Sequence, residues 1–575
     1  SFQAENAITS GIAKVTRENS YVLYQLTGHG EASLESDFTE TLDNSGVTVQ
    51  DLNLLTNDTV PEDAAALLIN DPQADLSTLD AAAIKTYLEN GGHLFVTTDL
   101  TVSTPNLDAL LAEYGMTRQE GLVIENDSNY YLYGTAQTCL LPNLSSNEIT
   151  AGVLEPLMAL LFAAVMLCSV VGGFTRILRD VAPRRRTLYW VVVDLAHVSL
   201  IALCYTNDIF TGYVFIEICT IASCALLCAR DRGRCLIASV RYMIFSLIGS
   251  GLFLIGVIYT YSITGHLLFP NLHAAIGALW LEGTYRFSMT VAIGLMAVGL
   301  GVKSGLFPFH FWMPDTYGQA TPASSGILSG VVSKGYIFLL IKIIYQAVGI
   351  EVFAASGIQN ILLILGVCGM VAGSVSAIAA RRLTTMVAFS SAAQIGYIYM
   401  GLGLGTQAAL LAVFFQIFAH ALTKPMLFLS SAGLIAASGG RQEIRDMRGA
   451  GHRDEVSGVL FTIGALSMVG IPIFAGFVPK LYFALAAFHM GWRTWVVLLA
   501  LAVSTVLNVL YFLYAAILLW LPEQQERLPA GAGAGRLSMQ AAAAPAALAI
   551  LNLLVGLQPS ALTQFLQQGM ELFCK

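Results

Sequence analysis

Residues 301–315, GVKSGLFPFHFWMPD, place one lysine among apolar residues and follow it with two prolines. The run before them, SMTVAIGLMAVGL, is apolar enough to lie inside a membrane-spanning helix. A charged side chain such as Lys303 is costly at that depth, and such residues usually have a function. Pro308 and Pro314 lack the backbone N–H that a continuous helix needs. The stretch therefore predicts a discontinuous membrane helix with an ionisable group beside its break.

The composition of the chain excludes an ordinary soluble protein. Of 575 residues, 55% are hydrophobic and only 12% are charged, and the mean hydropathy is +0.67. The charges are unevenly distributed: residues 1–150 hold four basic and 22 acidic side chains, whereas the remainder has a net charge of +9. We therefore expect an acidic soluble domain over 1–150 and a polytopic, mainly α-helical membrane domain over 151–575.

About twelve segments of the second domain are long and apolar enough to span a bilayer. They cover residues 156–175, 187–205, 208–229, 242–263, 287–310, 322–344, 358–380, 384–403, 406–437, 455–488, 493–521 and 540–559. The loops predicted on one side carry about 17 arginines, and those on the other side carry only Arg286, Lys342, Arg493 and Lys575. This bias places the arginine-rich side in the cytoplasm of a cell (inner) membrane protein, so the acidic domain is expected to be extracytoplasmic.

Several ionisable side chains lie within the predicted spans rather than in loops. They are Glu217, Lys303, Lys334, His420, Lys424 and Lys480. Ionisable groups in such numbers inside a membrane usually mark an ion or proton path. A structural polar contact or a lysine that reaches the membrane surface is the alternative for each one alone. For Asp194 and His197, a weaker pair in VVVDLAHVSL, we prefer the structural explanation.

Prolines interrupt two of the predicted spans near these lysines. They are Pro308 and Pro314 in the fifth span, and Pro472 and Pro479 in the tenth. Broken helices at membrane depth persist only where protein or a water-filled cavity satisfies the freed backbone groups. Two spans, five segments apart, share an apolar half, a break and a nearby lysine, Lys303 or Lys480. This pattern is typical of an inverted repeat with its functional site at the breaks.

The first 150 residues alternate strand and helix patterns. YVLYQLTGHGE, VTVQDLNL and AAALLINDP are typical of strands, and LDAAAIKTYLENGGHLFVTTD of a helix, a Gly-Gly stop and another strand. This order predicts an α/β fold with a largely parallel sheet. His29 and Glu31 follow the first strand, where such folds often bind ligands. In the alternative interpretation, Gly28 and Gly30 make the turn and His29 has no role.

This soluble segment resembles the extracytoplasmic domain of gliding-motility-type ABC-transporter auxiliary proteins. The similarity lies in LTGHGE, ALLINDPQADLS, YLENGGHLFV and NYYLYGTAQTCLLPNLSSNEIT, and it covers most of residues 1–150. It implies a binding or scaffolding domain, without a catalytic residue to carry over.

The membrane domain is similar to the antiporter-like proton-conducting subunits shared by respiratory complex I, membrane-bound hydrogenases and Mrp-type cation/proton antiporters. The motifs are KSGLFPFHFWMPDTYGQATPASSGILSGVVSKGY, TNDIFTGYVFIEICTIAS and HALTKPMLFL, and the similarity covers about residues 155–560. This resemblance implies a proton relay and assigns its parts. Glu217 and Lys303 are the ion pair, Lys334 is the bridging residue, His420 and Lys424 are central-axis residues, and Lys480 is the distal lysine. The family's first two membrane helices are missing here, but they are peripheral in its fold.

Three functions stay open at this point. The chain is expected to be a proton-translocating subunit of a redox-driven pump, working with other membrane subunits and membrane lipids. Alternatively it is a subunit of an Mrp-type Na⁺/H⁺ antiporter, or a non-transporting auxiliary of an ABC exporter. No nucleotide, flavin or iron–sulfur motif occurs, so no cofactor is expected and redox chemistry belongs to partners. Nine cysteines without a CxxC pair favour packing over metal binding, and the acidic soluble domain argues against nucleic-acid binding.

Overall fold

The computed structural model describes residues 21–34, 36–44, 47–54, 56–57, 59–61, 63–99, 102–118, 154–230, 233–522 and 539–573. The chain divides into two compact units, Ser1–Asn143 and Leu144–Lys575, and each is described by itself. Some predicted features lie outside the described residues: NYYLYGTAQTCLLPNLSSNEIT, Cys139, Arg232, Arg527, Arg536, Cys574 and Lys575.

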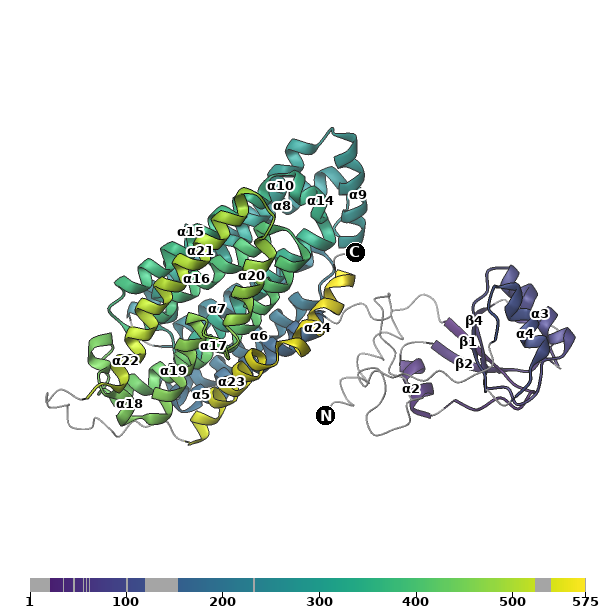
Figure 1. The fold of residues 1–575 in the computed structure, drawn as a ribbon, viewed down its shortest axis with the longest axis horizontal. Helices are drawn as coiled ribbons and strands as arrows, with labels where there is room; N and C mark the ends of the chain where they lie inside the picture. Colours follow the sequence, from purple (N-terminus) through teal and green to yellow (C-terminus); the bar gives the residue numbers. More distant parts are fainter. Residues whose placement is uncertain are drawn as a thin grey trace. The chain divides into compact units, whose positions relative to one another are not determined.

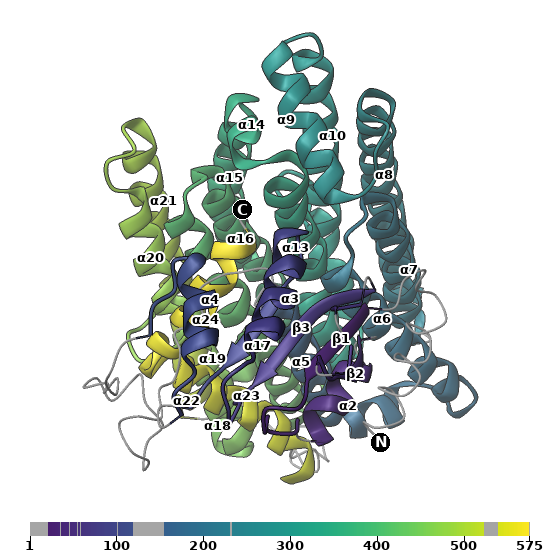
Figure 2. The same cartoon turned by 90° about the vertical axis from the view of Figure 1, so that its right-hand side faces the viewer.

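The soluble unit contains a four-stranded sheet of order β2-β1-β3-β4. β1 (Tyr21–Leu26) lies between β2 (Val47–Leu52) and β3 (Ala64–Asn70), as Figure 2 shows, and β4 (Leu94–Thr97) pairs with β3. Every pair is parallel, which confirms the predicted sheet type. The strand order reverses between β1 and β3, and the carboxyl ends of such strands are where ligands often bind.

Three helices accompany this sheet: α2 (Ser36–Asn44), α3 (Thr78–Glu89) and α4 (Pro105–Glu113). Alternate residues of β1, among them Tyr24 and Leu26, point to one face of the sheet. They form one buried cluster with Ile84 of α3 and Leu110 of α4. The apolar residues of the predicted strand β1 therefore also contribute to the hydrophobic core of this unit.

The membrane unit is a bundle of long helices joined by short breaks and turns. The helices before the first break are α5 (Leu154–Asp180), α6 (Arg186–Tyr205), α7 (Ile209–Cys228), α8 (Gly233–Thr264), α9 (Phe269–Glu282) and α10 (Arg286–Ser304). They are followed by η2 (Phe309–Trp312), α11 (Met313–Gln319), α12 (Pro322–Ile327), η3 (Leu328–Val332), α13 (Ser333–Lys342), η4 (Ile343–Val348), α14 (Ile350–Ala355), α15 (Ile358–Ala379), α16 (Leu383–Leu404) and α17 (Gln407–Ala437). The last are η5 (Ile444–Met447), α18 (Ala450–Arg453), α19 (Glu455–Val469), α20 (Phe477–Ala487), α21 (Trp492–Asn508), η6 (Val509–Leu513), α22 (Tyr514–Trp520), α23 (Met539–Leu557) and α24 (Pro559–Phe573). In Figure 1, α15, α16 and α21 run alongside one another.

Ten helices of the described residues are long and apolar enough to cross a membrane, and an eleventh span results if α23 and α24 are taken together. That pair corresponds to the last predicted span and bends by 81°. The tenth predicted span, 455–488, consists of two shorter helices, α19 and α20, because its break divides it. The protein is therefore a multi-pass membrane protein.

Both predicted breaks are present. α10 ends before Gly305, whose φ of 87° is left-handed, and α19 ends before Gly470, whose φ is 86°. Glycine adopts such angles without steric cost. The prolines stand at or near the starts of the following helices: Pro308 before η2, Pro314 in the first turn of α11, Pro472 in the link after α19, and Pro479 in the first turn of α20. The inverted relation between the two broken spans stays a prediction.

Three spans lie in the interior of the bundle. The apolar windows of the span Pro322–Val348 and of α17 are 100% buried by the rest of the chain and that of α16 is 94% buried, whereas most other spans are about half buried. The span Pro322–Val348 carries Lys334, and α17 carries His420 and Lys424. Their side chains therefore face protein rather than lipid.

Candidate functional site

Lys303 and Glu217 form an ion pair between α10 and α7. The Lys303 Nζ lies 3.2 Å from Glu217 Oε1 and donates a hydrogen bond to Thr220 Oγ1 at 2.7 Å. Ser250 of α8 donates a hydrogen bond to the same carboxylate oxygen. The lysine side chain is completely buried, whereas the carboxylate side chain keeps 24% of its surface exposed. Three helices thus meet at one charge pair, and the pairing of Glu217 with Lys303 is the one that the family resemblance implies.

Glycines hold α8 and α10 close together at this pair. A Cβ atom at Gly249 would lie 2.7 Å from the Gly299 carbonyl oxygen and 2.9 Å from Lys303 Cγ. A Cβ at Gly299 would lie 2.6 Å from the Gly249 oxygen. Because real Cβ contacts are longer, the two helices can approach only through glycine, and that approach sets the position of Lys303.

Lys334 is fully buried beside a π-helical segment. Its ammonium donates to the Ser329 carbonyl oxygen within that segment, η3, and lies 3.3 Å from Ser333 Oγ. π-helical turns inside α-helices are often found at functional sites. Gly330 in η3 leaves space for Pro425 of α17, because a Cβ there would lie 2.9 Å from the proline ring. The helices of Lys334 and Lys424 therefore pack closely.

Lys424 and His420 lie in α17 and are also buried. Lys424 Nζ donates to the Val387 carbonyl oxygen at 2.8 Å and to Ser390 Oγ at 2.5 Å, both on α16. Neither ring nitrogen of His420 has a hydrogen-bond partner among the described residues. His420 lies one helical turn before Lys424 on α17, and Gly330, four residues before Lys334, packs against Pro425 of the same helix, so the three residues lie on helices in contact.

Lys480 reaches back across the second break. Its Nζ lies 2.5 Å from the Val469 carbonyl oxygen and 3.3 Å from that of Met468, both at the end of α19. A cation at this position complements the partial negative charge of a helix C-terminus. The ammonium also lies 3.4 Å from Thr505 Oγ1 and 5.7 Å from the Tyr397 ring centre. The lysine therefore links α20 to α19 and to α21.

A polar cluster on α21 and η6 was not singled out in the sequence. Asn508 is completely buried, and its Oδ1 accepts a hydrogen bond from Tyr511 in the π-helical segment η6. Ser504, one turn earlier, lies 3.4 Å from Ser374 Oγ of α15. One signal was available, since an asparagine inside an apolar helix is costly unless it has a partner.

One sequence assignment was wrong: Lys342 does not lie in an outer loop. Its side chain is buried in the last turn of α13 and donates to the Cys204 carbonyl oxygen at 2.8 Å. It also pairs with Glu155 Oε1 at 3.5 Å. The partners come from α5 and α6, more than 130 positions away, and no local pattern predicts such a contact.

Asp194 and His197 do not form a pair. The His197 Nδ1 contacts Met166 Sδ at 3.3 Å, while the Asp194 side chain lies at the surface of the bundle. No hydrogen bond or ion pair joins the two side chains among the described residues, and the structural explanation stays a prediction.

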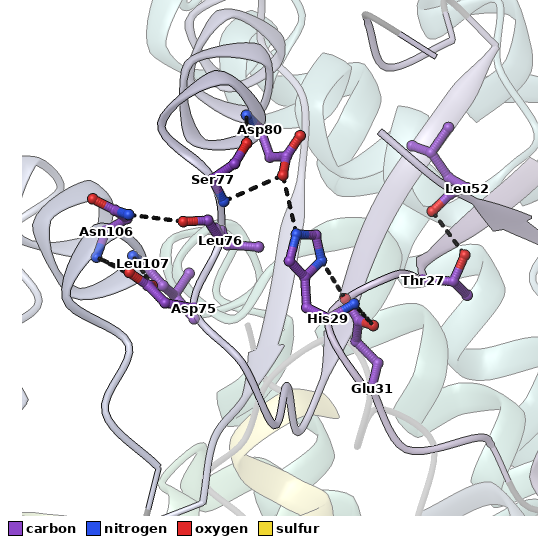
Figure 3. Close-up of polar contacts among 10 residues, drawn as sticks. All are labelled: Thr27, His29, Glu31, Leu52, Asp75, Leu76, Ser77, Asp80, Asn106 and Leu107. Atoms are coloured by element: carbon purple, nitrogen blue, oxygen red, sulfur yellow. Dashed lines mark hydrogen bonds and ion pairs between the residues drawn. The ribbon is translucent and has the colours of Figure 1, made fainter. Parts of the chain in front are cut away.

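The soluble unit holds a separate cluster around His29. Figure 3 shows its imidazole between two carboxylates: Nδ1 lies 3.0 Å from Glu31 Oε1, and Nε2 lies 3.0 Å from Asp80 Oδ2. All three side chains are buried, and Asp80 also accepts from the backbone N–H of Ser77 at the start of α3. His29 thus ties the loop after β1 to α3, Gly28 and Gly30 make the turn with φ of 122° and 78°, and a role of His29 in ligand binding stays a prediction.

No set of three or more His, Cys, Asp or Glu side chains within the described ranges is arranged to hold a metal ion.

A buried ion pair at a broken helix, followed by lysines on interior helices, defines a polytopic membrane protein of ion-transport type. Residues 206–508, slightly more than half of the chain, match the family model described as NADH:quinone oxidoreductase/Mrp antiporter, TM. The chain belongs to this family, which confirms the resemblance of its motifs. Residues 21–137 match a model described as ABC-type uncharacterized transport system, in agreement with the second resemblance.

Individual relatives agree with this family. The chain is 32% identical over 396 residues to NADH-quinone oxidoreductase subunit N of Desulforudis audaxviator, covering 67% of this chain and 76% of the relative. It is 30% identical over 312 residues to a Na(+)/H(+) antiporter subunit of Alkalihalophilus pseudofirmus, covering 54% and 62%. Among solved structures, an archaeal membrane-bound sulfane sulfur reductase chain matches with a TM-score of 0.64 at 27% identity, covering 74% of this chain and 83% of that chain.

Proposed function

We propose that the membrane unit translocates protons as one subunit of a multisubunit, redox-driven membrane complex. The family match, the subunit N relative and the respiratory complex among the structural neighbours support this function. The observation that carries it is the buried Lys303–Glu217 pair at the first break. Beyond it, Lys334 and Lys424 have only neutral oxygens of the described residues within hydrogen-bonding distance, as expected of groups that hold a proton transiently.

The proposed route begins at the ion pair. Glu217 stabilises the charged Lys303 by Coulomb attraction in a medium of low dielectric constant. When a neighbouring subunit perturbs the partly exposed carboxylate, the proton of Lys303 moves to Lys334. It then passes through His420 or Lys424 to Lys480, which exchanges it with the outside.

The loss of Lys424 tests this route. Electron-donor-driven proton uptake is measured in inverted membrane vesicles that contain the assembled complex. We expect background uptake with Lys424→Ala and partial uptake with Lys424→Arg, which keeps the charge. Unchanged uptake with Lys424→Ala in an assembled complex contradicts the route.

We propose that the protein lies in the cell membrane and that its soluble domain is extracytoplasmic. The soluble domain is taken as residues 1–150 and the membrane domain as residues 151–575. The arginine-rich loops on the opposite side support this orientation. Cysteines introduced at exposed positions of α3, such as Leu79, should react with a membrane-impermeant maleimide in intact cells. Labelling only after lysis contradicts this orientation.

The Na(+)/H(+) antiporter relative favours a second candidate, a subunit of an Mrp-type Na⁺/H⁺ antiporter. Proton flux driven by a Na⁺ gradient, without any electron donor, distinguishes it from a redox-driven pump.

The match over residues 21–137 favours a third candidate, an auxiliary of an ABC exporter. Co-purification with an ATPase and a normal phenotype of Lys303→Ala would support that candidate.

A further inference from the structure

A cavity of about 360 Å³ opens where α15 ends, beside η5 and η6. Its walls combine two arginines, Arg381 and Arg445, with two tyrosines, Tyr511 and Tyr514, and apolar residues such as Leu510. At about 30 Å³ per water molecule, this space equals about twelve waters. None of the proposed relay residues lines it.

The positions of the two arginines are fixed by backbone pairing. The Arg381 carbonyl oxygen accepts the Ile444 N–H at 2.8 Å, and the Leu383 N–H donates to the Gln442 oxygen at 3.0 Å. The loop after α15 and the segment leading into η5 are therefore joined next to the cavity. Both guanidinium groups are carried on these joined segments.

The cavity has an excess of positive charge. No hydrogen bond or ion pair of the Arg381 side chain occurs among the described residues. Arg445 has Glu443 at 3.3 Å, but both side chains are largely exposed, so this pair is weak. Arg382 adjoins the same loop. Planar guanidinium groups bind phosphate through paired N–H donors, which makes a phosphate the expected counterion.

The surface that leads away from the cavity is apolar. Ile378 and Val375 on α15 are exposed, as are Leu510 on η6 and Tyr514 and Ile517 on α22. These residues belong to membrane-spanning helices, so their exposed side chains are expected to contact the hydrocarbon of the bilayer. A ligand with a phosphate at one end and acyl chains at the other matches both surfaces.

We propose that this cavity binds the headgroup of an anionic phospholipid, with its phosphate on Arg381 and Arg445 and its acyl chains along α15 and α22. Basic pockets between membrane helices on the cytoplasmic side commonly hold anionic headgroups. The cytoplasmic leaflet follows if the orientation proposed above is correct, but the site itself does not depend on proton transport.

The site adjoins the polar cluster of η6. Tyr511 lines the cavity together with Met386 of α16, and its hydroxyl donates a hydrogen bond to Asn508 Oδ1. A bound headgroup would therefore restrain this π-helical segment.

Lipid add-back to the purified, delipidated complex tests the proposal. Binding of dioleoyl phosphatidylglycerol and dioleoyl phosphatidylcholine is measured by native mass spectrometry. We expect one tightly bound phosphatidylglycerol, at least tenfold weaker binding of phosphatidylcholine, and at least tenfold weaker phosphatidylglycerol binding by Arg381→Gln/Arg445→Gln. The matched control, Arg184→Gln/Arg234→Gln, removes two exposed arginines elsewhere and should bind normally.

Several results would overturn the proposal. The first is equal binding of both lipids, and the second is unchanged phosphatidylglycerol binding by Arg381→Gln/Arg445→Gln. The third is full displacement of phosphatidylglycerol by millimolar inorganic phosphate, which would indicate a site for a free anion. If the double variant does not assemble, Arg381→Gln alone is used, with at least threefold weaker binding expected. A neighbouring subunit that occupies the cavity in the assembled complex also contradicts it. Because binding is measured without transport, failure of the proton route leaves this test intact.

Discussion

Glu217 and Lys303 are 86 positions apart in sequence, yet Oε1 and Nζ are 3.2 Å apart across α7 and α10. The two partners differ in access, because the lysine is completely buried and the carboxylate keeps 24% of its surface exposed. A neighbouring protein can therefore alter the carboxylate without touching the lysine. Because of this difference in exposure, the ion pair is the point at which a neighbouring subunit acts on the proposed relay.

The hydroxyl of Thr220 should stabilise the charged form of Lys303. Thr220→Val removes the acceptor that lies 2.7 Å from Lys303 Nζ while keeping the side-chain volume. Hydrogen bonds to charged groups contribute about 1.5–3 kcal/mol, so proton uptake should fall about tenfold or more. Thr220→Ser keeps a hydroxyl and should retain most uptake. Equal uptake by both variants would show that Thr220 has no part in holding the charge.

The glycine contact between α8 and α10 gives a second prediction. In Gly249→Ala, the added methyl group would lie 2.7 Å from the Gly299 oxygen and 2.9 Å from Lys303 Cγ. We expect a loss of about 1–3 kcal/mol in unfolding free energy together with reduced proton uptake. Gly251→Ala, on the same helix with open space around its Cβ, is the control. Thermal unfolding and vesicle assays of both variants distinguish the two sites.

The buried Lys342–Glu155 pair should respond to single and double substitution differently. Lys342→Met leaves the Glu155 carboxylate, which is 13% exposed, without its partner, and breaking buried pairs costs about 3–5 kcal/mol. Glu155→Met/Lys342→Met removes both charges, so it should be more stable than the single lysine variant. Chemical unfolding in detergent measures both, and a double variant no more stable than Lys342→Met would mean that the two groups do not interact.

In the soluble unit, substitution of Asp80 should lower stability more than substitution of an acidic residue at the surface. Asp80→Ala removes the partner of His29 and the acceptor for the Ser77 N–H, with an expected loss of about 2–4 kcal/mol. Glu113→Gln breaks an exposed pair with Lys85 and should have almost no effect. Hydrogen exchange of α3 in the full chain reports the difference. Similar protection in both variants would show that the His29 cluster does not contribute to the stability of this unit.

The sequence predicted those features that depend on local pattern. Long apolar runs gave nearly all of the spans, and proline next to a buried lysine gave both breaks, because these signals lie within one helix. The short apolar runs YVLYQL and AAALLIN likewise predicted strands β1 and β3. The pairing of Glu217 with Lys303 came from the family motif rather than from spacing.

The missed features depend on contacts between distant segments. Lys342 follows an apolar run near a span end, where a lysine usually reaches the membrane surface. Only the packing of α5 and α6 against α13 buries it. Asn508 looked like an isolated polar residue, because Tyr511 becomes its partner through the π-helical geometry of η6. α9 was not predicted, since Gly265 and Gly283 enclose a helix of only 14 residues.

Proton uptake by the assembled complex with Lys303→Ala and with Glu217→Ala tests the central claim most directly. Inverted vesicles are energised with the electron donor of the complex, and assembly is checked by co-purification. Asp194→Asn, which changes a carboxylate at the surface of the same bundle, is the control. The account predicts background uptake for both site variants and normal uptake for the control. Normal coupled uptake in both site variants would contradict it.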